Sequence, residues 1–302
     1  MSKESLLLEE TIRRKLDPLM LVARKVRAGA IKGERRSTKK GTSIEFADYR
    51  NYAPGDDLRR LDWNVYARTE RPYIKLLEDE EDLAVHILLD ASDSMNWPRD
   101  DTAPSDVNKL LFAKRLLAGL AYISLSSNDR LTLTAFKQDD WDVFGPARGR
   151  AQSVMMLRYA HQISASGMVD LNDSLKDYVT RAARPGLCFL ITDMFSPSGY
   201  VDGLNLLIGK GYEVVLIHLL SPDEVTPPLV GDLRLIDVET STAQEVSLDA
   251  GMRELYMRRV TAWREEIQIQ CNKRGAHYLP LTTDIAWEKV LLYDLRKLSV
   301  VK

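Results

Sequence analysis

The sequence contains few cysteines and few histidines, which limits the redox and metal chemistry that we expect of it. Cys188 and Cys271 are the only cysteines among 302 residues, and the four histidines are scattered without the spacing of metal ligands. Cys188 lies in an apolar segment and Cys271 near the end of a predicted helix, positions typical of buried structural thiols. We therefore expect neither a disulfide framework nor a zinc site.

Long apolar runs are also missing. No segment approaches the roughly 18 apolar residues that cross a membrane as a helix. Residues 1–16 carry charges on both sides of a short apolar run at residues 6–8, unlike a secretory signal peptide. The composition, with 45% hydrophobic and 28% charged residues, is that of an ordinary globular protein. We expect a cytoplasmic protein without a membrane span.

The common catalytic motifs are absent as well. The sequence has no Gly-x-x-x-x-Gly-Lys-Ser/Thr phosphate loop, no His-Glu-x-x-His helix, no Gly-x-Gly-x-x-Gly turn and no Gly-x-Ser-x-Gly elbow. Nothing in the pattern places a nucleophile beside a base. We therefore expect a protein that is not an enzyme and has no small-molecule substrate. A metal-dependent hydrolase is the enzymatic alternative.

The formal net charge of −2 conceals a basic segment near the start of the chain. Residues 13–40 contain eleven lysines and arginines against two acidic residues. Apolar positions within residues 5–28 have helical spacing, and Pro18 marks a break. This basic amphipathic segment either packs on its own domain or binds an anionic surface or a partner. Because Lys and Arg clusters contact phosphates, nucleic-acid binding is a further alternative.

Two apolar segments lead into carboxylates. One begins at residue 84 and ends in Asp90, and the other ends in Asp193. Each is typical of a buried strand, and the carboxyl ends of parallel strands form the edge at which open α/β sheets bind ligands. Ser92 and Ser94 follow Asp90 closely, so hydroxyl groups join the carboxylates there. An oxygen-rich group of this kind suits Mg²⁺.

The order Asp90-x-Ser92-x-Ser94 after a strand resembles the metal-ion-dependent adhesion site of von Willebrand factor A domains. The resemblance implies that Ser92 and Ser94 ligate Mg²⁺ or Mn²⁺. It implies that Asp90 and Asp193 assist through water. It also implies an open coordination position, which a carboxylate of a partner protein completes.

One loop departs from the pattern of that family. The family's threonine ligand corresponds to a position within residues 166–171, and Val169 stands there in this chain. A valine cannot ligate a metal, so the site lacks one ligand unless Ser166 or Asp170 replaces it. Two hypotheses remain open: a working metal site, and an adhesion site that has lost its metal.

A second resemblance covers residues 41–68. The residues that carry it are Gly41, Glu45, Phe46, Arg50, Tyr52, Pro54, Gly55, Asp56, Asp57, Arg59, Asp62, Trp63, Ala67 and Arg68. This pattern closely resembles the signature of domain of unknown function 58, a prokaryotic family typically encoded beside MoxR-type AAA+ ATPases. The resemblance implies such an ATPase as a partner, together with other proteins of the same operon. Many members carry two membrane helices before the signature, and this chain resembles the short soluble form.

The signature interleaves aspartates with arginines, a composition suited to paired carboxylates and guanidinium groups. Such pairs either clamp an irregular segment or form a docking surface for a partner. The candidate partner-binding residues are Arg50, Asp56, Asp57, Arg59, Asp62, Trp63 and Arg68.

From about residue 81 onward, strand-like and helical segments alternate, which predicts a mainly parallel sheet with helices on both faces. We therefore predict an α/β protein with a doubly wound sheet, of the von Willebrand factor A-like, Rossmann type, at residues 81–302. An N-terminal extension at residues 1–80 is expected to hold the basic helix, irregular segments and short strands. The expected function is protein interaction through the adhesion site, as partner or adaptor of a MoxR-type ATPase. The alternative is a metal-independent scaffold that uses the Arg/Asp-rich signature surface.

Overall fold

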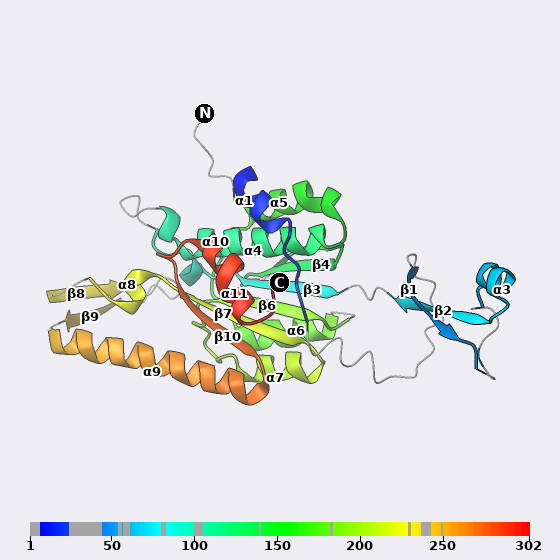
Figure 1. Cartoon of the computed structure of the whole chain (residues 1–302). Coiled ribbons are helices and arrows are strands. Elements are labelled where there is room, and N and C mark those ends of the chain that lie inside the picture. The colour runs from blue at the N-terminus through cyan, green and yellow to red at the C-terminus, as the bar shows by residue number, and fades with distance from the viewer. Residues whose placement is uncertain are drawn as a thin grey trace. The chain divides into compact units, whose positions relative to one another are not determined.

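The computed structural model describes residues 7–23, 44–53, 56, 61–79, 83–99, 105–138, 140–181, 184–228, 231–236, 243–248 and 250–302. These residues form two compact units (Figure 1). The larger unit combines residues 7–23 with the residues from 83 onward, and the smaller unit lies within residues 44–79. No helix among the described residues is long and apolar enough to cross a membrane.

The larger unit is built on a six-stranded sheet with the order β10-β7-β6-β3-β4-β5. Its strands are β3 (Ala84–Asp90), β4 (Arg130–Phe136), β5 (Trp141–Ala147), β6 (Leu187–Thr192), β7 (Glu213–Leu220) and β10 (His277–Thr282). All neighbours are parallel except β4 and β5. Counted in chain order, the strands lie as 3-2-1-4-5-6, the order of a doubly wound sheet. The predicted α/β class with a mainly parallel sheet is confirmed.

Helices cover both faces of the sheet (Figure 1). The described helices of this unit are α1 (Glu10–Leu16), α4 (Lys109–Ser126), α5 (Ser153–Gln162), α6 (Leu171–Arg181), α7 (Val201–Gly209), α8 (Pro222–Val225), α9 (Ala250–Arg274), α10 (Trp287–Lys289) and α11 (Leu295–Lys297). Short 3-10 turns lie at Asp93–Met95, Ser105–Val107 and Arg150–Gln152, and a π-helical turn lies at Val290–Asp294. One face packs against α1, α4, α5 and the C-terminal helices, and the other against α6, α7 and α9.

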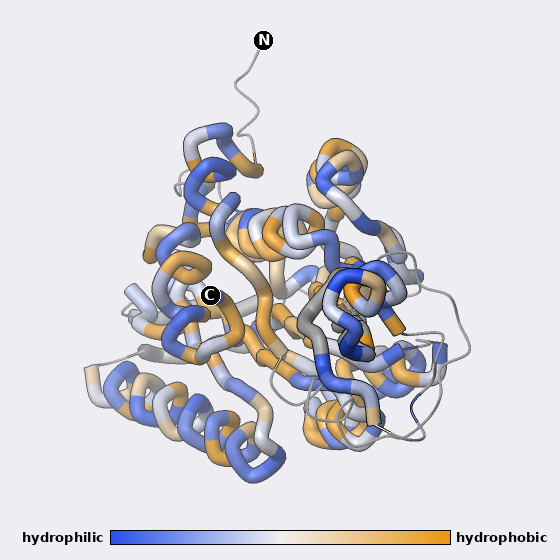
Figure 2. Tube along the Cα trace, turned by 45° about the vertical axis from the view of Figure 1, so that its right-hand side comes forward, coloured by the Kyte–Doolittle hydropathy of each residue, from blue (hydrophilic) through white to orange (hydrophobic). Residues whose placement is uncertain are grey.

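Side chains of the central strands alternate between these two cores. Along β3, Ile87 and Leu89 belong to the core on the α4 side, whereas Leu88 belongs to the core on the α6 side. This follows from the two-residue period of a strand. Figure 2 shows apolar residues in orange along the central strands. A strand that is buried on both faces therefore delivers its last residue, Asp90, to the sheet edge.

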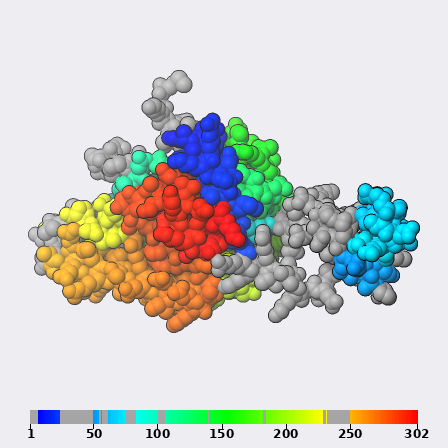
Figure 3. Space-filling model, in the orientation of Figure 1, coloured from blue at the N-terminus to red at the C-terminus, as the bar shows by residue number. Residues whose placement is uncertain are grey.

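The N-terminal segment belongs to the larger unit. Leu16 is fully buried in the core that contains α4, and Leu21 forms an antiparallel bridge with Val301. Figure 3 shows this segment, in blue, against the C-terminal residues, in red. Gly119 of α4 permits the close packing, because a side chain there would overlap Leu291. The prediction placed residues 1–80 in one extension, whereas the described apolar positions of residues 7–23 pack on the α/β unit itself.

The smaller unit contains β1 (Ile44–Asn51), α3 (Trp63–Thr69) and β2 (Tyr73–Asp79). The two strands pair antiparallel. Ile74 is buried and forms an isolated bridge with Leu61. In the larger unit, a separate antiparallel pair precedes α9, formed by β8 (Gly231–Ile236) and β9 (Ala243–Leu248).

Candidate functional site

The carboxyl ends of β3 and β6 lie side by side where the sheet reverses its winding. β3 pairs with β6, Asp90 ends β3, and Asp193 directly follows β6. The next long helix after β3, α4, packs on one face, and the helix after β6, α7, packs on the other. Open α/β sheets bind ligands at such switch points. The structure therefore brings both predicted carboxylates to one edge.

Asp90 is buried and is held by hydrogen bonds to both carboxylate oxygens. Oδ1 accepts the backbone N–H of Ser92 at 3.0 Å, and Oδ2 accepts the hydroxyl of Thr192 at 2.8 Å. Burial raises the pKa of Asp90 to about 7, and the charge of Asp193 acts in the same direction. Both oxygens of Asp90 thus have partners within the protein.

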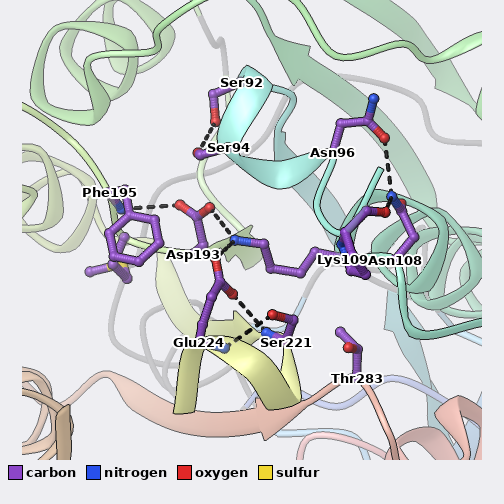
Figure 4. A network of polar contacts seen from close by, with 12 residues as sticks. Ser92, Ser94, Asn96, Asn108, Lys109, Asp193, Phe195, Ser221, Glu224 and Thr283 are labelled. Atoms are coloured by element: carbon purple, nitrogen blue, oxygen red, sulfur yellow. Dashed lines mark hydrogen bonds and ion pairs between the residues drawn. The ribbon is translucent and has the colours of Figure 1, made fainter. Parts of the chain in front are cut away.

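Ser92 and Ser94 lie at the 3-10 turn that follows β3. Their hydroxyl oxygens are 3.0 Å apart, which is a hydrogen bond in which either group can donate (Figure 4). The backbone N–H of Asp93 donates to the Gly167 carbonyl at 2.7 Å. This bond ties the two predicted serine ligands to the loop that contains Val169.

That loop places no threonine-like ligand at the edge. Val169 is 2% exposed and packs in the core on the α6 side. Asp170 Oδ1 accepts the Asp173 N–H at 3.1 Å and the Ser198 hydroxyl at 2.7 Å, so this carboxylate caps the start of α6. Ser166 is exposed. The missing hydroxyl of Val169 is therefore not replaced by Asp170, which is engaged elsewhere.

Lys109 completes the polar network at the edge. Its side chain is completely buried, and Nζ donates to Asp193 Oδ2 at 2.8 Å and to Glu224 Oε1 at 2.6 Å (Figure 4). The ring centroid of Phe195 lies 5.2 Å from Nζ. Burial alone lowers the pKa of a lysine, but the two carboxylates outweigh it, and the pKa of Lys109 is raised. A permanent cation therefore lies between the two carboxylates.

Local structure fixes the position of Lys109. It is the first residue of α4, whose N-cap Asn108 accepts the Leu111 N–H at 3.0 Å. Asn108 Nδ2 also donates to Asn96 Oδ1 at 3.1 Å, and the Lys109 N–H donates to the Trp97 carbonyl at 2.8 Å. The helix dipole disfavours a lysine in the first turn. The buried carboxylates, rather than the helix, therefore stabilise the ammonium there.

Glu224 and Asp193 are positioned by bonds to backbone groups. Glu224 forms a capping box with Ser221 at the start of α8: Oε2 accepts the Ser221 N–H at 2.7 Å, and the Glu224 N–H donates to Ser221 Oγ at 3.3 Å. Asp193 Oδ1 accepts the Phe195 N–H at 3.0 Å. Each carboxylate thus offers Lys109 one oxygen while its other oxygen stays bonded to the backbone.

Two residues at the predicted divalent-cation position differ from the adhesion-site pattern. Asp193 is ion-paired with Lys109, and Val169 offers no oxygen. Within the described ranges, no group of three or more His, Cys, Asp or Glu side chains is placed to hold a metal ion. The four predicted ligands gather at one edge, but the positive charge beside them comes from the protein itself.

Lys109, Glu224 and Thr192 also belong to the site, although they were not predicted from the sequence. Two signals were present. Ser221-Pro222-Asp223-Glu224 has the spacing of a capping box, and Lys109 is a charged residue at the start of a mainly apolar helical run. Neither signal indicates that the two side chains meet, because they lie 115 positions apart.

Comparison with known proteins assigns the family. A family model described as "Protein of unknown function DUF58" matches residues 48–266. The chain belongs to the DUF58 family. The uncharacterized protein Rv1480 of Mycobacterium tuberculosis is 28% identical over 283 residues, which cover 93% of this chain and 84% of that protein. The uncharacterized protein MAV169 of Mycobacterium avium is 31% identical over 104 residues, or 34% of this chain and 61% of that protein.

Two solved structures are similar to this DUF58 protein at low identity. BatB from Bacteroides thetaiotaomicron matches with a TM-score of 0.43 and 15% identity, over 72% of this chain and 98% of BatB. The SpRpn10 VWA domain matches with a TM-score of 0.37 and 10% identity, over 68% of this chain and 91% of that domain.

The described residues of the DUF58 signature lie in the smaller unit, where three of them serve its local structure. Arg50 Nη2 pairs with Asp56 Oδ1 at 2.7 Å, and Asp56 Oδ2 accepts the Ala53 N–H at 2.8 Å. The hydrogen bond from Arg50 lowers the pKa of Asp56. Asp62 is the N-cap of α3, and its Oδ1 accepts the Asn64 N–H at 2.9 Å. Arg50, Asp56 and Asp62 thus bond within the smaller unit, as the structural clamp that was one of the two alternatives requires.

Three further signature residues, Trp63, Ala67 and Arg68, are exposed on α3, where Trp63 adjoins Tyr66. Trp63 is 61% exposed and Tyr66 is 42% exposed, with their rings edge to face at 6.2 Å. Arg68 is exposed and its Nε donates to the Asn64 carbonyl at 3.3 Å. The candidate partner-binding residues Asp57 and Arg59 lie outside the described residues.

Proposed function

We propose that this DUF58 protein is a non-enzymatic interaction module that binds a partner protein at the carboxyl edge of its sheet without a divalent cation. The observation that carries the proposal is the buried pairing of Lys109 with Asp193 and Glu224. It gives the edge a fixed arrangement of charges that comes entirely from the chain.

The loops around this network supply apolar contact surface. Trp97, Met168 and Phe195 are each between 38% and 41% exposed, and they lie on the loops after β3, before α6 and after β6. Exposed aromatic and methionine side chains are enriched in protein interfaces. The backbone N–H of Leu171 donates to Ser196 Oγ at 2.9 Å, which joins two of these loops. Loops that are already linked lose little entropy when a partner binds.

The side chains at this edge support a role other than catalysis. Both oxygens of Asp90 accept hydrogen bonds, and the hydroxyls of Ser92 and Ser94 bond to each other. The two cysteines are buried; burial raises the pKa of Cys271 to about 11 and raises that of Cys188 as well. Thiols with raised pKa values are poor nucleophiles at neutral pH.

The proposed partner is a MoxR-type AAA+ ATPase, as the DUF58 signature implies. A second candidate surface for the same partner is the exposed face of α3 in the smaller unit, because Trp63 and Tyr66 present adjoining aromatic rings there. This corresponds to the metal-independent scaffold considered from the sequence.

Biolayer interferometry with the full chain and a nucleotide-free MoxR-type ATPase from the same organism tests the proposal. We expect the dissociation constant to be unchanged by EDTA and to rise about tenfold or more in the Trp97→Ala, Met168→Ala double variant. Val154→Ala removes an apolar side chain that is 67% exposed on α5, and this control should bind normally. Binding that EDTA abolishes would contradict the metal-free mechanism. Binding that only Trp63→Ala reduces would place the interface on α3 instead.

A further inference from the structure

Three buried or largely buried carboxylates lie at the sheet edge, and two of them share the Lys109 ammonium. Asp193 and Glu224 each bond to Lys109 Nζ, and Asp90 lies close enough to Asp193 for their charges to interact. Buried like charges repel strongly in an environment of low dielectric constant and require a compensating cation. In adhesion sites of the type that the sequence resembles, a divalent metal has that role.

We propose that the Lys109 ammonium takes the place of the divalent cation at this edge, as a cation tethered to α4, and that a divalent-cation site of carboxylate and hydroxyl oxygens forms when this amine is removed. The ligands of that site would come from Asp90, Ser92, Ser94 and Asp193. The ligand class is a hard divalent ion such as Mn²⁺ or Mg²⁺.

The distances match an ammonium ion. The two N···O distances of 2.8 and 2.6 Å are those of charge-assisted hydrogen bonds. A bound Mg²⁺ would require oxygens at about 2.1 Å in octahedral geometry. An ammonium needs only acceptors within hydrogen-bonding reach, and both acceptors are themselves held by backbone N–H groups of Phe195 and Ser221.

The tethered cation also explains the position of Val169. A metal that loses its threonine ligand is held less well, whereas an ammonium that is covalently attached to the chain needs no ligand at that position. Val169 instead fills the core on the α6 side, where it is 2% exposed. The buried Lys109 and the replacement of the threonine ligand by Val169 therefore go together: with the ammonium in place, the threonine hydroxyl is not needed.

The burial of the pair distinguishes it from an ordinary surface ion pair. The side chains of Lys109 and Asp193 are both 0% exposed, and the backbone of Lys109 is fixed by Asn108 and by the Trp97 carbonyl. The inference rests on the proposed function in one respect, namely that the sheet edge binds its partner without a metal ion. Its test measures metal binding alone, so a failure of partner binding leaves it unaffected.

Calorimetric titration of the EDTA-stripped full chain with MnCl₂ tests the inference. We expect no saturable binding to the wild type and saturable one-to-one binding to Lys109→Met. Lys114→Met is the matched control, since Lys114 also lies on α4 but donates to the carbonyls of His161 and Ile163. This control should bind no Mn²⁺, and adding Asp193→Asn to Lys109→Met should abolish the new site.

A second variant covers the case in which Lys109→Met does not fold without metal. Lys109→Met combined with Glu224→Gln removes both charges of this ion pair, the ammonium and one carboxylate, and leaves the four proposed ligands. We expect Mn²⁺ to raise its melting temperature but not that of the wild type. Two results would overturn the inference: saturable Mn²⁺ binding to the wild type that Ser92→Ala removes, or a folded double variant that binds Mn²⁺ no better than the wild type.

Discussion

His86 is a buried histidine on β3 whose two ring nitrogens both have partners. Nε2 lies 3.0 Å from the Arg184 carbonyl and must donate, because a carbonyl can only accept. Nδ1 lies 2.6 Å from the Tyr178 hydroxyl. In the neutral ring it therefore accepts a hydrogen bond from that hydroxyl. Burial lowers the pKa of His86 to about 4. The folded protein thus favours the uncharged imidazole over most of the physiological pH range.

Stability should consequently fall as the pH is lowered. The unfolded chain protonates this histidine near its ordinary pKa of about 6.5, so between there and about 4 the unfolded state binds more protons. For His86 alone, the linkage predicts a loss of roughly 2 kcal/mol in unfolding free energy between about pH 7.5 and about pH 5. Urea unfolding at both pH values measures it. His86→Gln should reduce the difference by that amount, whereas exposed His161→Gln should not; equal pH dependence in His86→Gln and wild type would contradict the account.

From the sequence, individual site residues were predictable only where they stand at or just after the end of a mainly apolar strand. Asp90 ends one mainly apolar strand and Asp193 follows another, and parallel pairing of β3 with β6 brings such ends together. Lys109 carries no comparable signal, because a lysine that opens a helix is ordinarily solvated. Its partners come from the ends of two other segments, and only the tertiary fold joins the three.

At the scale of elements, the periodicity of apolar residues predicted the sheet and its covering helices. It did not predict the surface on which the N-terminal segment packs. Its apolar spacing indicated an amphipathic helix, and packing on its own domain was one of two alternatives. The structure places Leu16 against α4, which is buried along most of its length beneath the terminal segments. A sequence pattern shows which face of a helix is apolar, but the complementary surface is assembled by residues far away in the chain.

Gly119 of α4 lets the terminal segments pack closely on this helix, and its substitution tests that packing. Its missing side chain leaves room for Leu291, and Trp287 lies 3.3 Å from where a Cβ would be. Gly119→Ala should destabilise the larger unit by about 1–3 kcal/mol through overpacking, despite the better helix propensity of alanine. Denaturant unfolding followed by circular dichroism measures the change. Gly209→Ala on α7 meets no atom within 4 Å and should be neutral or slightly stabilising; equal effects at both positions would refute the packing argument.

At the scale of the whole molecule, the two compact units have separate cores. Ile74 is buried within the smaller unit and belongs to neither core of the larger one. Ile74→Ala should therefore lower the protection of amides in β1 and β2 against hydrogen exchange while leaving β3, β6 and β7 unchanged. A cavity of this kind typically costs about 2–5 kcal/mol. Loss of protection in β3 would show that the two units unfold together.

The smaller unit is attached to the larger one at both of its ends, since residues 7–23 precede it in the chain and residue 83 onward follows it. A mechanical pull on the smaller unit therefore loads the larger unit at two points. One load reaches residues 20–22, which make three backbone hydrogen bonds with residues 300–302, and the other reaches β3, which is hydrogen-bonded to a strand on each side. The three bonds of the N-terminal segment are the weaker backbone attachment. Tension would peel the N-terminal segment away first and uncover α4, while the sheet and its charged edge stayed intact.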